Sequence, residues 1–137
     1  MKSQSPLLKQ AIGLAVGLCV QYILGMAINL YVTFPKSNDV RSLWEYARAQ
    51  PLVMAHIIFG TLLLIGSIAI TVRAFKSENH TWKTCTVLGL VAILTAWVSG
   101  ERFISTQNDA YSLSMAIGFI LGILAYAWGI FSSLNHS

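Results

Sequence analysis

Four long stretches of the chain contain no Asp, Glu, Lys or Arg, and they cover residues 10–35, 49–72, 84–100 and 110–137. A helix needs about 20 mostly apolar residues to cross a membrane, because each residue adds about 1.5 Å across a core about 30 Å thick. The first, second and fourth stretches reach that length. The third reaches it when its apolar flanks are included. The pattern predicts four transmembrane helices, over residues 7–33, 51–73, 82–103 and 110–134.

The composition supports a lipid environment. The 137 residues are 55% hydrophobic and only 10% charged, whereas an ordinary soluble domain is about 25% charged. A short soluble protein has a large surface for its volume and could not cover it with so few charges. We therefore expect an all-α integral membrane four-helix bundle, forming a single domain over residues 1–137.

The segment between the first two predicted membrane helices has its own helical pattern. Its apolar residues recur at i, i+3, i+4 and i+7, as Val40, Leu43, Trp44 and Ala47. Asn38 or Asp39 can cap a helix there, and Arg41 and Glu45 stand four residues apart. This pattern predicts a short amphipathic helix in the first outer loop, lying on the membrane surface. An irregular solvated loop is the alternative.

The distribution of Lys and Arg predicts the orientation. The first apolar run exceeds the 7–15 residues of a signal peptide, so we expect it to remain as a helix. Four crossings place both termini on one side. That side carries five basic residues and the other carries four: Lys2, Lys9, Arg73, Lys76 and Lys83 against Lys36, Arg41, Arg48 and Arg102. The positive-inside rule then favours cytoplasmic termini in a cell membrane.

Small residues form a stripe on each predicted helix, as helix packing in lipid requires. Gly13 and Gly17 form one GxxxG pair, and Gly118 and Gly122 form another. These pairs can pack within the chain, or against a second copy or another membrane-complex subunit. Trp82 is typical of an aromatic anchor at the membrane interface. No Lys/Arg-rich run is present, so nucleic acid is not an expected partner.

His56 is the most informative candidate functional residue, because ionisable residues inside lipid are costly. A buried histidine is expected to be neutral, and neutral imidazole is a good ligand for iron. Gly60, one turn further on, removes a side chain from the same face and leaves a gap for a flat macrocycle. In the alternative reading, His56 makes one hydrogen bond to a neighbouring helix and Gly60 serves packing alone.

Other candidates lie near the same predicted depth. Met115 is a candidate soft metal ligand opposite His56, although methionine more often serves packing. Glu101 can orient His56, and Arg102 can bind an acidic group such as a propionate. In the alternative, both charged residues end the third helix at the interface. Hydrolase and phosphate-binding motifs are missing from the sequence, and we do not expect an enzyme.

Four segments resemble one four-helix half of the haem A synthase family: VQYILGMAINLYVTFP, PLVMAHIIFG, TAWVSGERF and SLSMAIGF. They include a Q-x-x-x-G element, Gln21 and Gly25, and the histidine of the second helix. The resemblance implies that His56 is an axial ligand of a b-type haem. In that family, a histidine at the start of the fourth helix supplies the second haem ligand. This chain has no histidine there, since the corresponding residues are Ser112, Leu113, Ser114 and Met115. Either Met115 replaces it, or the iron is five-coordinate, or no haem binds.

The expected function is therefore that of a small membrane protein with haem b in its outer half, held by His56, Gly60, Gln21, Met115, Glu101 and Arg102. Electron transfer, haem sensing and haem handling are all compatible with such a site. Haem A synthesis is not implied, because that chemistry requires both halves of the family's fold. A non-catalytic accessory or scaffold subunit is the rival hypothesis, and a small-solute transporter is a third.

Overall fold

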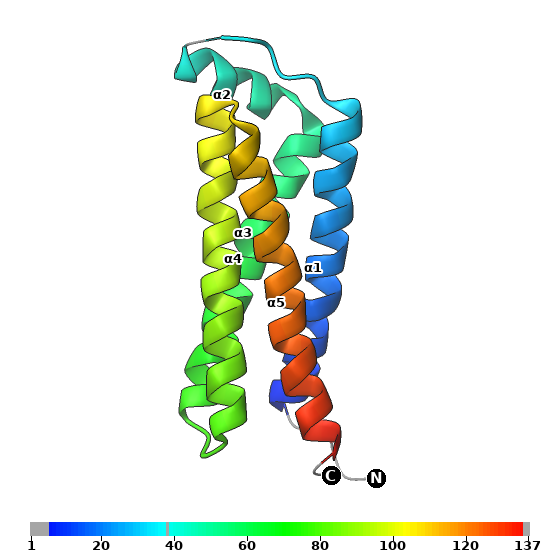
Figure 1. The fold of residues 1–137 in the computed structure, drawn as a ribbon, viewed down its shortest axis with the longest axis vertical. Coiled ribbons are helices and arrows are strands. Elements are labelled where there is room, and N and C mark those ends of the chain that lie inside the picture. Colours follow the sequence, from blue (N-terminus) through cyan, green and yellow to red (C-terminus); the bar gives the residue numbers. More distant parts are fainter. Residues whose placement is uncertain (1–5, 38, 136–137) are drawn as a thin grey trace.

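The computed structural model of the protein describes residues 6–37 and 39–135, and within these ranges the fold is all helical. Four helices are long and one is short (Figure 1). They are α1 (Pro6–Tyr31), α2 (Val40–Ala49), α3 (Pro51–Phe75), α4 (His80–Thr106) and α5 (Asp109–Asn135). The start of α1 and the end of α5 lie at one end of the molecule, and α2 lies at the other.

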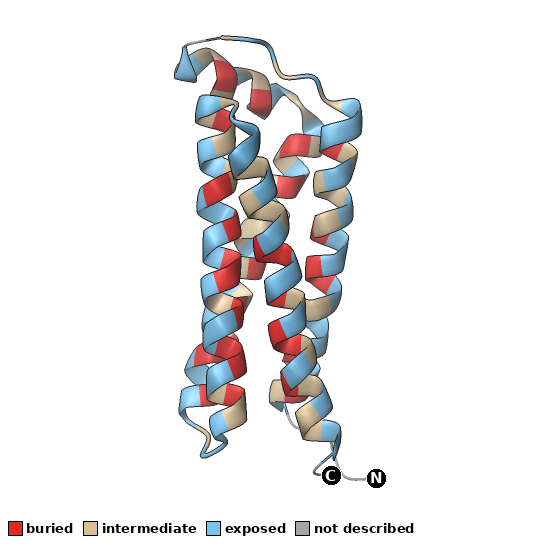
Figure 2. Ribbon diagram, viewed as in Figure 1, coloured by how far each residue is buried: buried red, intermediate tan, exposed pale blue. Residues whose placement is uncertain are grey.

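The four long helices are long and apolar enough to cross a membrane, as the sequence predicts. The shortest, α3, has 25 residues, which corresponds to about 37 Å at about 1.5 Å per residue. Figure 2 shows buried residues along their inner faces and exposed residues outside. The exposed residues include many large apolar side chains, such as Ile23, Leu62 and Phe131. A surface of this kind is suited to lipid rather than to water.

The long helices pack in the cyclic order α1, α3, α4, α5, with α5 closing against α1. The diagonal pairs, α1 with α4 and α3 with α5, make no backbone contact in the described residues. The short helix α2 contacts α3 and α4 only. It therefore covers one side of its end of the molecule and leaves the α1–α5 side without a helical cover.

Local signals explain where the helices begin and end. Asp39 accepts hydrogen bonds from the N–H groups of Arg41 and Ser42, both at 3.2 Å, and so caps α2. Asn38, the other predicted cap, lies outside the described residues. Gln107 ends α4 with a φ of 53°, a left-handed conformation in which its N–H donates to the Phe103 carbonyl at 2.8 Å. The chain then turns directly into α5.

The first long helix ends two residues earlier than predicted, at Tyr31. The following segment is held by tertiary contacts instead. The ring of Phe34 meets those of Tyr46 and Phe103 edge-on, at centroid distances of 5.7 and 5.8 Å. The Tyr46 hydroxyl also donates to the Thr33 carbonyl at 2.9 Å. These contacts bind the α1–α2 connection to α2 and α4.

Aromatic rings fill glycine notches between α4 and α5 in the half of the molecule near the termini. A Cβ on Gly89 would lie 2.7 Å from the Tyr126 ring, and one on Gly129 would lie 2.8 Å from the Trp82 ring. Trp82 is therefore only 4% exposed. The prediction of Trp82 as an interface anchor is wrong, because the notch at Gly129 admits its ring to the core.

Most of the predicted GxxxG glycines pack within the chain. A Cβ on Gly118 would lie 2.8 Å from the Ala92 carbonyl oxygen of α4, and one on Gly17 would lie 2.6 Å from Leu63 of α3. Gly122 faces Leu18 of α1 at 3.2 Å by the same measure. Gly13, in contrast, is exposed, and a Cβ on it would meet no atom of another helix within 4 Å. Three of these four glycines therefore set distances between helices of this chain.

The close approach at Gly118 gives a stability prediction. We expect Gly118→Ala to lower the free energy of unfolding in detergent by about 1–3 kcal/mol, because the added methyl meets backbone that must shift. Gly13→Ala is the matched control, and its higher helix propensity should leave stability equal or raise it by up to about 1 kcal/mol. Equal effects of the two substitutions on the unfolding midpoint would contradict the α4–α5 packing.

Candidate functional site

Two polar side chains and two glycines interlock between α1 and α3. Gln21 and Gly25 are four residues apart on α1, and His56 and Gly60 are four apart on α3, which runs the opposite way. A Cβ on Gly60 would lie 2.7 Å from Gln21 Nε2, and one on Gly25 would lie 3.2 Å from His56 Cε1. Each polar side chain thus occupies the space that the opposite helix's glycine leaves free.

A hydrogen bond fixes this arrangement. Gln21 Nε2 donates to the backbone carbonyl of His56 at 2.8 Å. In a helix that carbonyl points toward residue 60, and the missing side chain there lets the amide of Gln21 reach it. Gln21 is only 2% exposed. The gap at Gly60 is therefore filled by Gln21, and the expectation that a macrocycle lies against Gly60 is not met in this arrangement.

The imidazole of His56 is buried without a hydrogen-bond partner among the described residues. His56 is 9% exposed, and its Nδ1 atom is fully enclosed and unpaired. Its ring meets that of Phe119 edge-on, with centroids 6.1 Å apart. Gln21 Oε1 is likewise enclosed and unpaired. An unsatisfied buried polar atom costs about 1–3 kcal/mol, so two on neighbouring residues require an explanation.

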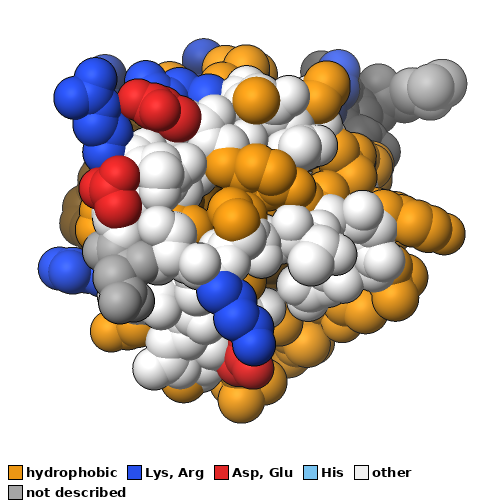
Figure 3. Space-filling model, turned by 90° about the horizontal axis from the view of Figure 1, so that it is seen from above, with side chains coloured by type: hydrophobic (Ala, Val, Ile, Leu, Met, Phe, Trp, Pro, Cys, Tyr) orange, Lys and Arg blue, Asp and Glu red, His pale blue; other side chains and the backbone are white. Residues whose placement is uncertain are grey.

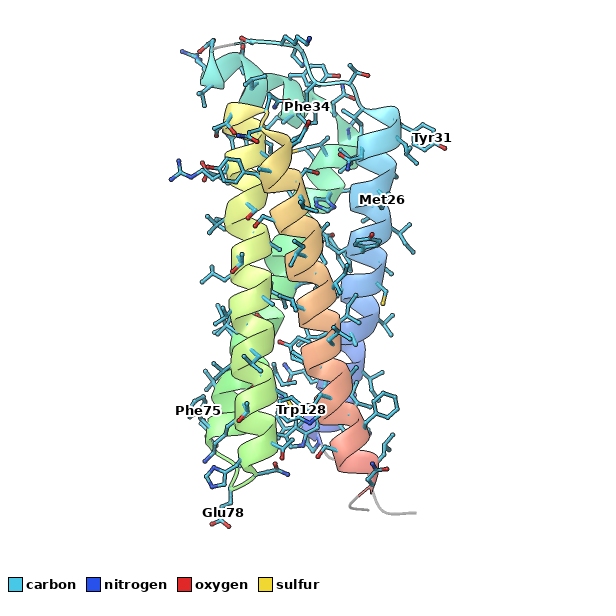
Figure 4. The ribbon with its side chains drawn as sticks, viewed as in Figure 1. Met26, Tyr31, Phe34, Phe75, Glu78 and Trp128 are labelled. Carbon is cyan, nitrogen blue, oxygen red and sulfur yellow. The ribbon has the colours of Figure 1, made fainter. Side chains whose placement is uncertain are left out.

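A cavity of about 170 Å³ adjoins these residues in the half of the molecule nearer α2. All five helices contribute to its wall, and Phe34 of the α1–α2 connection contributes as well. The lining is almost entirely apolar. Figure 3 looks onto this end, where charged side chains lie toward the margin and apolar side chains are visible between uncharged groups. Phe34 lies among the helices there, whereas Tyr31 points away from them (Figure 4).

Five of the six predicted site residues line this cavity: Gln21, His56, Gly60, Glu101 and Met115. Arg102 does not. Its Nε atom lies 3.8 Å from Glu101 Oε2, and both side chains are well exposed. Glu101 makes no hydrogen bond to His56, so the expected orienting role is not seen. The alternative reading, in which the two charged residues end the helix at an interface, agrees with their exposure.

Met115 reaches the cavity from α5. Its sulfur lies 3.3 Å from the position of a Cβ on Gly100, so this glycine of α4 makes room for the thioether. Nearby, the hydroxyls of Ser99 and Ser114 are 3.0 Å apart and bond to each other. Within the described residues, no group of three or more His, Cys, Asp or Glu is placed to hold a metal ion. His56 and Met115 remain candidate ligands without a supporting carboxylate or thiolate.

Sequence reasoning missed several of the residues that shape the cavity. Phe119 follows Met115 by four residues and so shares its face of α5, a signal that was present in the sequence. Trp97 lines the wall and donates from Nε1 to Thr61 Oγ1 at 3.2 Å. Trp44 of α2 also lines it and donates to Ser105 Oγ at 3.4 Å. No local pattern connects these last two residues with His56.

Comparison of the chain with protein-family models, with curated proteins and with solved structures finds no match.

The interlock between α1 and α3 predicts an energetic coupling. Gly60→Ala should destabilise the protein, because the new methyl displaces the amide of Gln21, and the penalty should largely vanish in a Gln21→Ala background. We expect a coupling of about 0.5–3 kcal/mol in a double-mutant cycle measured by unfolding in detergent. As a control, Gly118→Ala, which faces α4, should combine additively with Gln21→Ala. An additive Gln21–Gly60 cycle would show that the two residues do not contact.

Proposed function

We propose that this chain is a membrane-spanning four-helix bundle that binds a small lipid-soluble molecule in the cavity beside His56 and Gln21. The short helix α2 would lie as an amphipathic helix at one membrane surface. It buries Leu43 and Ala47 against α3 and α4 and turns the ion pair of Arg41 and Glu45 outward. The four apolar helices and their apolar outer surface support this placement.

The charges at the two ends support cytoplasmic termini in a cell membrane. The end near the termini carries Lys9, Arg73, Lys76 and Lys83 with Glu78 as the acidic residue. At the α2 end, four basic residues are matched by four acidic ones: Lys36, Arg41, Arg48 and Arg102 against Asp39, Glu45, Glu101 and Asp109. Basic residues close to helix ends favour the cytoplasmic side, where anionic lipids also attract them.

One observation carries the ligand-binding proposal. The cavity is apolar, yet two buried side chains on its wall each hold a polar atom without a partner, His56 Nδ1 and Gln21 Oε1. Apolar pockets with a few such polar groups are the usual form of small-molecule sites. A ligand with one polar group would satisfy atoms that the protein leaves unpaired. Packing alone offers no such compensation.

Haem b is the second candidate, because an unpaired neutral imidazole suits iron. The residues do not fit a haem as they stand. The distal edge of His56 abuts α1, since a Cβ on Gly25 would lie within 4.0 Å of Cε1, Nδ1 and Nε2 alike. The volume of about 170 Å³ is also below the roughly 300–1,000 Å³ of typical small-molecule sites. Haem binding would require α1 to withdraw from α3.

The two remaining hypotheses make different demands. A transporter needs a pathway through both halves, but Ile70 and Tyr126 are fully buried in the packed half near the termini. A transport pathway within one chain would have to open that core. An accessory subunit needs no ligand and would copurify with a protein partner through its outer surface. It leaves the two unpaired buried atoms unexplained.

The ligand-binding proposal is tested by filling the cavity. Ile57 lines it, while the neighbouring Ile58 is 55% exposed on the outer surface. We expect organic extracts of purified wild-type protein and of Ile58→Phe to contain a common lipid-soluble compound that Ile57→Phe lacks, as read by mass spectrometry. Identical extracts from the three folded proteins would count against the proposal. A stoichiometric protein partner with no such compound would favour the accessory subunit.

Haem is tested by the visible absorption spectrum of protein expressed with ample haem, oxidised and dithionite-reduced. On the geometry we expect no Soret band. The control is His80→Ala, because His80 is exposed at the start of α4. A Soret band that is lost in His56→Ala and retained in His80→Ala would favour haem over a smaller ligand.

A further inference from the structure

The chemistry of the two unpaired atoms specifies the ligand's polar group. The amide of Gln21 has a fixed orientation, because Nε2 must be the atom that donates to the His56 carbonyl at 2.8 Å. Oε1 is therefore an acceptor only, and it needs a donor. Neutral His56 can carry its proton on Nδ1 and donate it. A hydroxyl would meet both needs, since its oxygen accepts from Nδ1–H while its proton goes to Oε1. Because both atoms are enclosed in the structure, the hydroxyl reaches them only when the two side chains shift toward the cavity.

The size of the cavity specifies the rest of the molecule. A cavity of about 150 Å³ lined by apolar side chains holds one benzene in another protein, and the cavity here is about 170 Å³. The cavity therefore has room for one six-membered ring. The aromatic side chains of Phe119 and Trp97 on the wall suit a flat aromatic ring.

The surroundings indicate entry from the membrane. Helix α2 contacts α3 and α4 but neither α1 nor α5, and α1 and α5 diverge toward the α2 end (Figure 1). The first nine residues of α5, from Asp109 to Ile117, include none that is fully buried. A substituent on the ring can therefore pass between these two helices and remain among the lipid chains.

We propose that the ligand is a lipid-soluble single-ring phenol, the chemical class that includes the heads of membrane quinols. Its hydroxyl would lie between Gln21 Oε1 and His56 Nδ1, and its ring beside Phe119. This inference rests on the proposed cavity-binding function and adds to it a requirement for a hydroxyl donor. It involves binding alone, with no bond made or broken.

The test compares 4-propylphenol with 4-propylanisole, which has a similar shape but carries a methyl in place of the donated proton. Binding is measured by calorimetry on protein in detergent micelles, with protein-free micelles as the blank. We expect the phenol to bind wild type and Ile58→Phe about tenfold more tightly than the anisole, which corresponds to about 1.4 kcal/mol. In Gln21→Met the two affinities should become equal.

Each outcome separates the two proposals. If the two compounds bind wild type equally, the hydroxyl requirement fails while cavity binding stands. If neither binds, the phenol inference fails, and the extracts of Ile57→Phe and Ile58→Phe decide separately whether cavity binding stands. A preference for the phenol that persists in folded Gln21→Met would also overturn the inference, because the hydroxyl would be recognised elsewhere. Should Gln21→Met not fold, Ile57→Phe decides, since the preference must disappear there and persist in Ile58→Phe.

Discussion

The hydrogen bond from Gln21 to the His56 carbonyl determines how α1 lies on α3. In lipid there is little hydrophobic driving force between helices, so close packing and hydrogen bonds must provide the association. This bond needs Gly60 to uncover the carbonyl and Gly25 to admit the imidazole. A rotation of either helix would direct both polar side chains into lipid or into backbone. The cavity exists where this register leaves the space between His56, Phe119 and α4 incompletely filled.

The two halves of the molecule differ in how their glycines are used. Near the termini, notches at Gly89 and Gly129 receive the large rings of Tyr126 and Trp82, and the core is closed. Near α2, the notches at Gly25 and Gly60 receive polar side chains, which fill less space and leave His56 Nδ1 and Gln21 Oε1 unpaired. The hydroxyl of Tyr126, in the half near the termini, is likewise buried without a hydrogen-bond partner among the described residues. The same packing device therefore gives a solid core at one end and a polar-tipped cavity at the other. This division explains why the candidate site lies in the α2 half although polar residues such as Ser67 and Thr71 are buried elsewhere.

The long helices were predictable because their signal is local. Charge-free stretches set their number, and the bounds differ by at most three residues. The start of α3 at Pro51 agrees, whereas α4 ends at Thr106 rather than at Phe103, because Gln107 supplies the left-handed turn. Part of the cavity wall was also predictable, since His56, Gln21 and Met115 are unusual at their depths, but most of its apolar residues were not. The side chain that fills each glycine gap was not predictable. The sequence indicates that Gly60 leaves a gap, but the occupant of the gap depends on the register of α1, as the burial of Trp82 depends on Gly129. One sequence signal for the pairing of α1 with α3 was available. On each helix a polar residue precedes a glycine by four positions, Gln21 and Gly25 on α1 and His56 and Gly60 on α3.

The two-residue connection between α4 and α5 has a consequence for assembly of the protein. Gln107 reverses the chain so tightly that the two helices form a hairpin whose contacts are close in sequence, and such contacts form early in folding. The contact of Leu18 with Gly122 joins α1 to α5 and closes a loop that contains the three intervening helices. It can form only after α5 has been synthesised, because α5 follows the other four helices in the sequence. Helix α5 therefore completes the wall around residues supplied by the first two long helices.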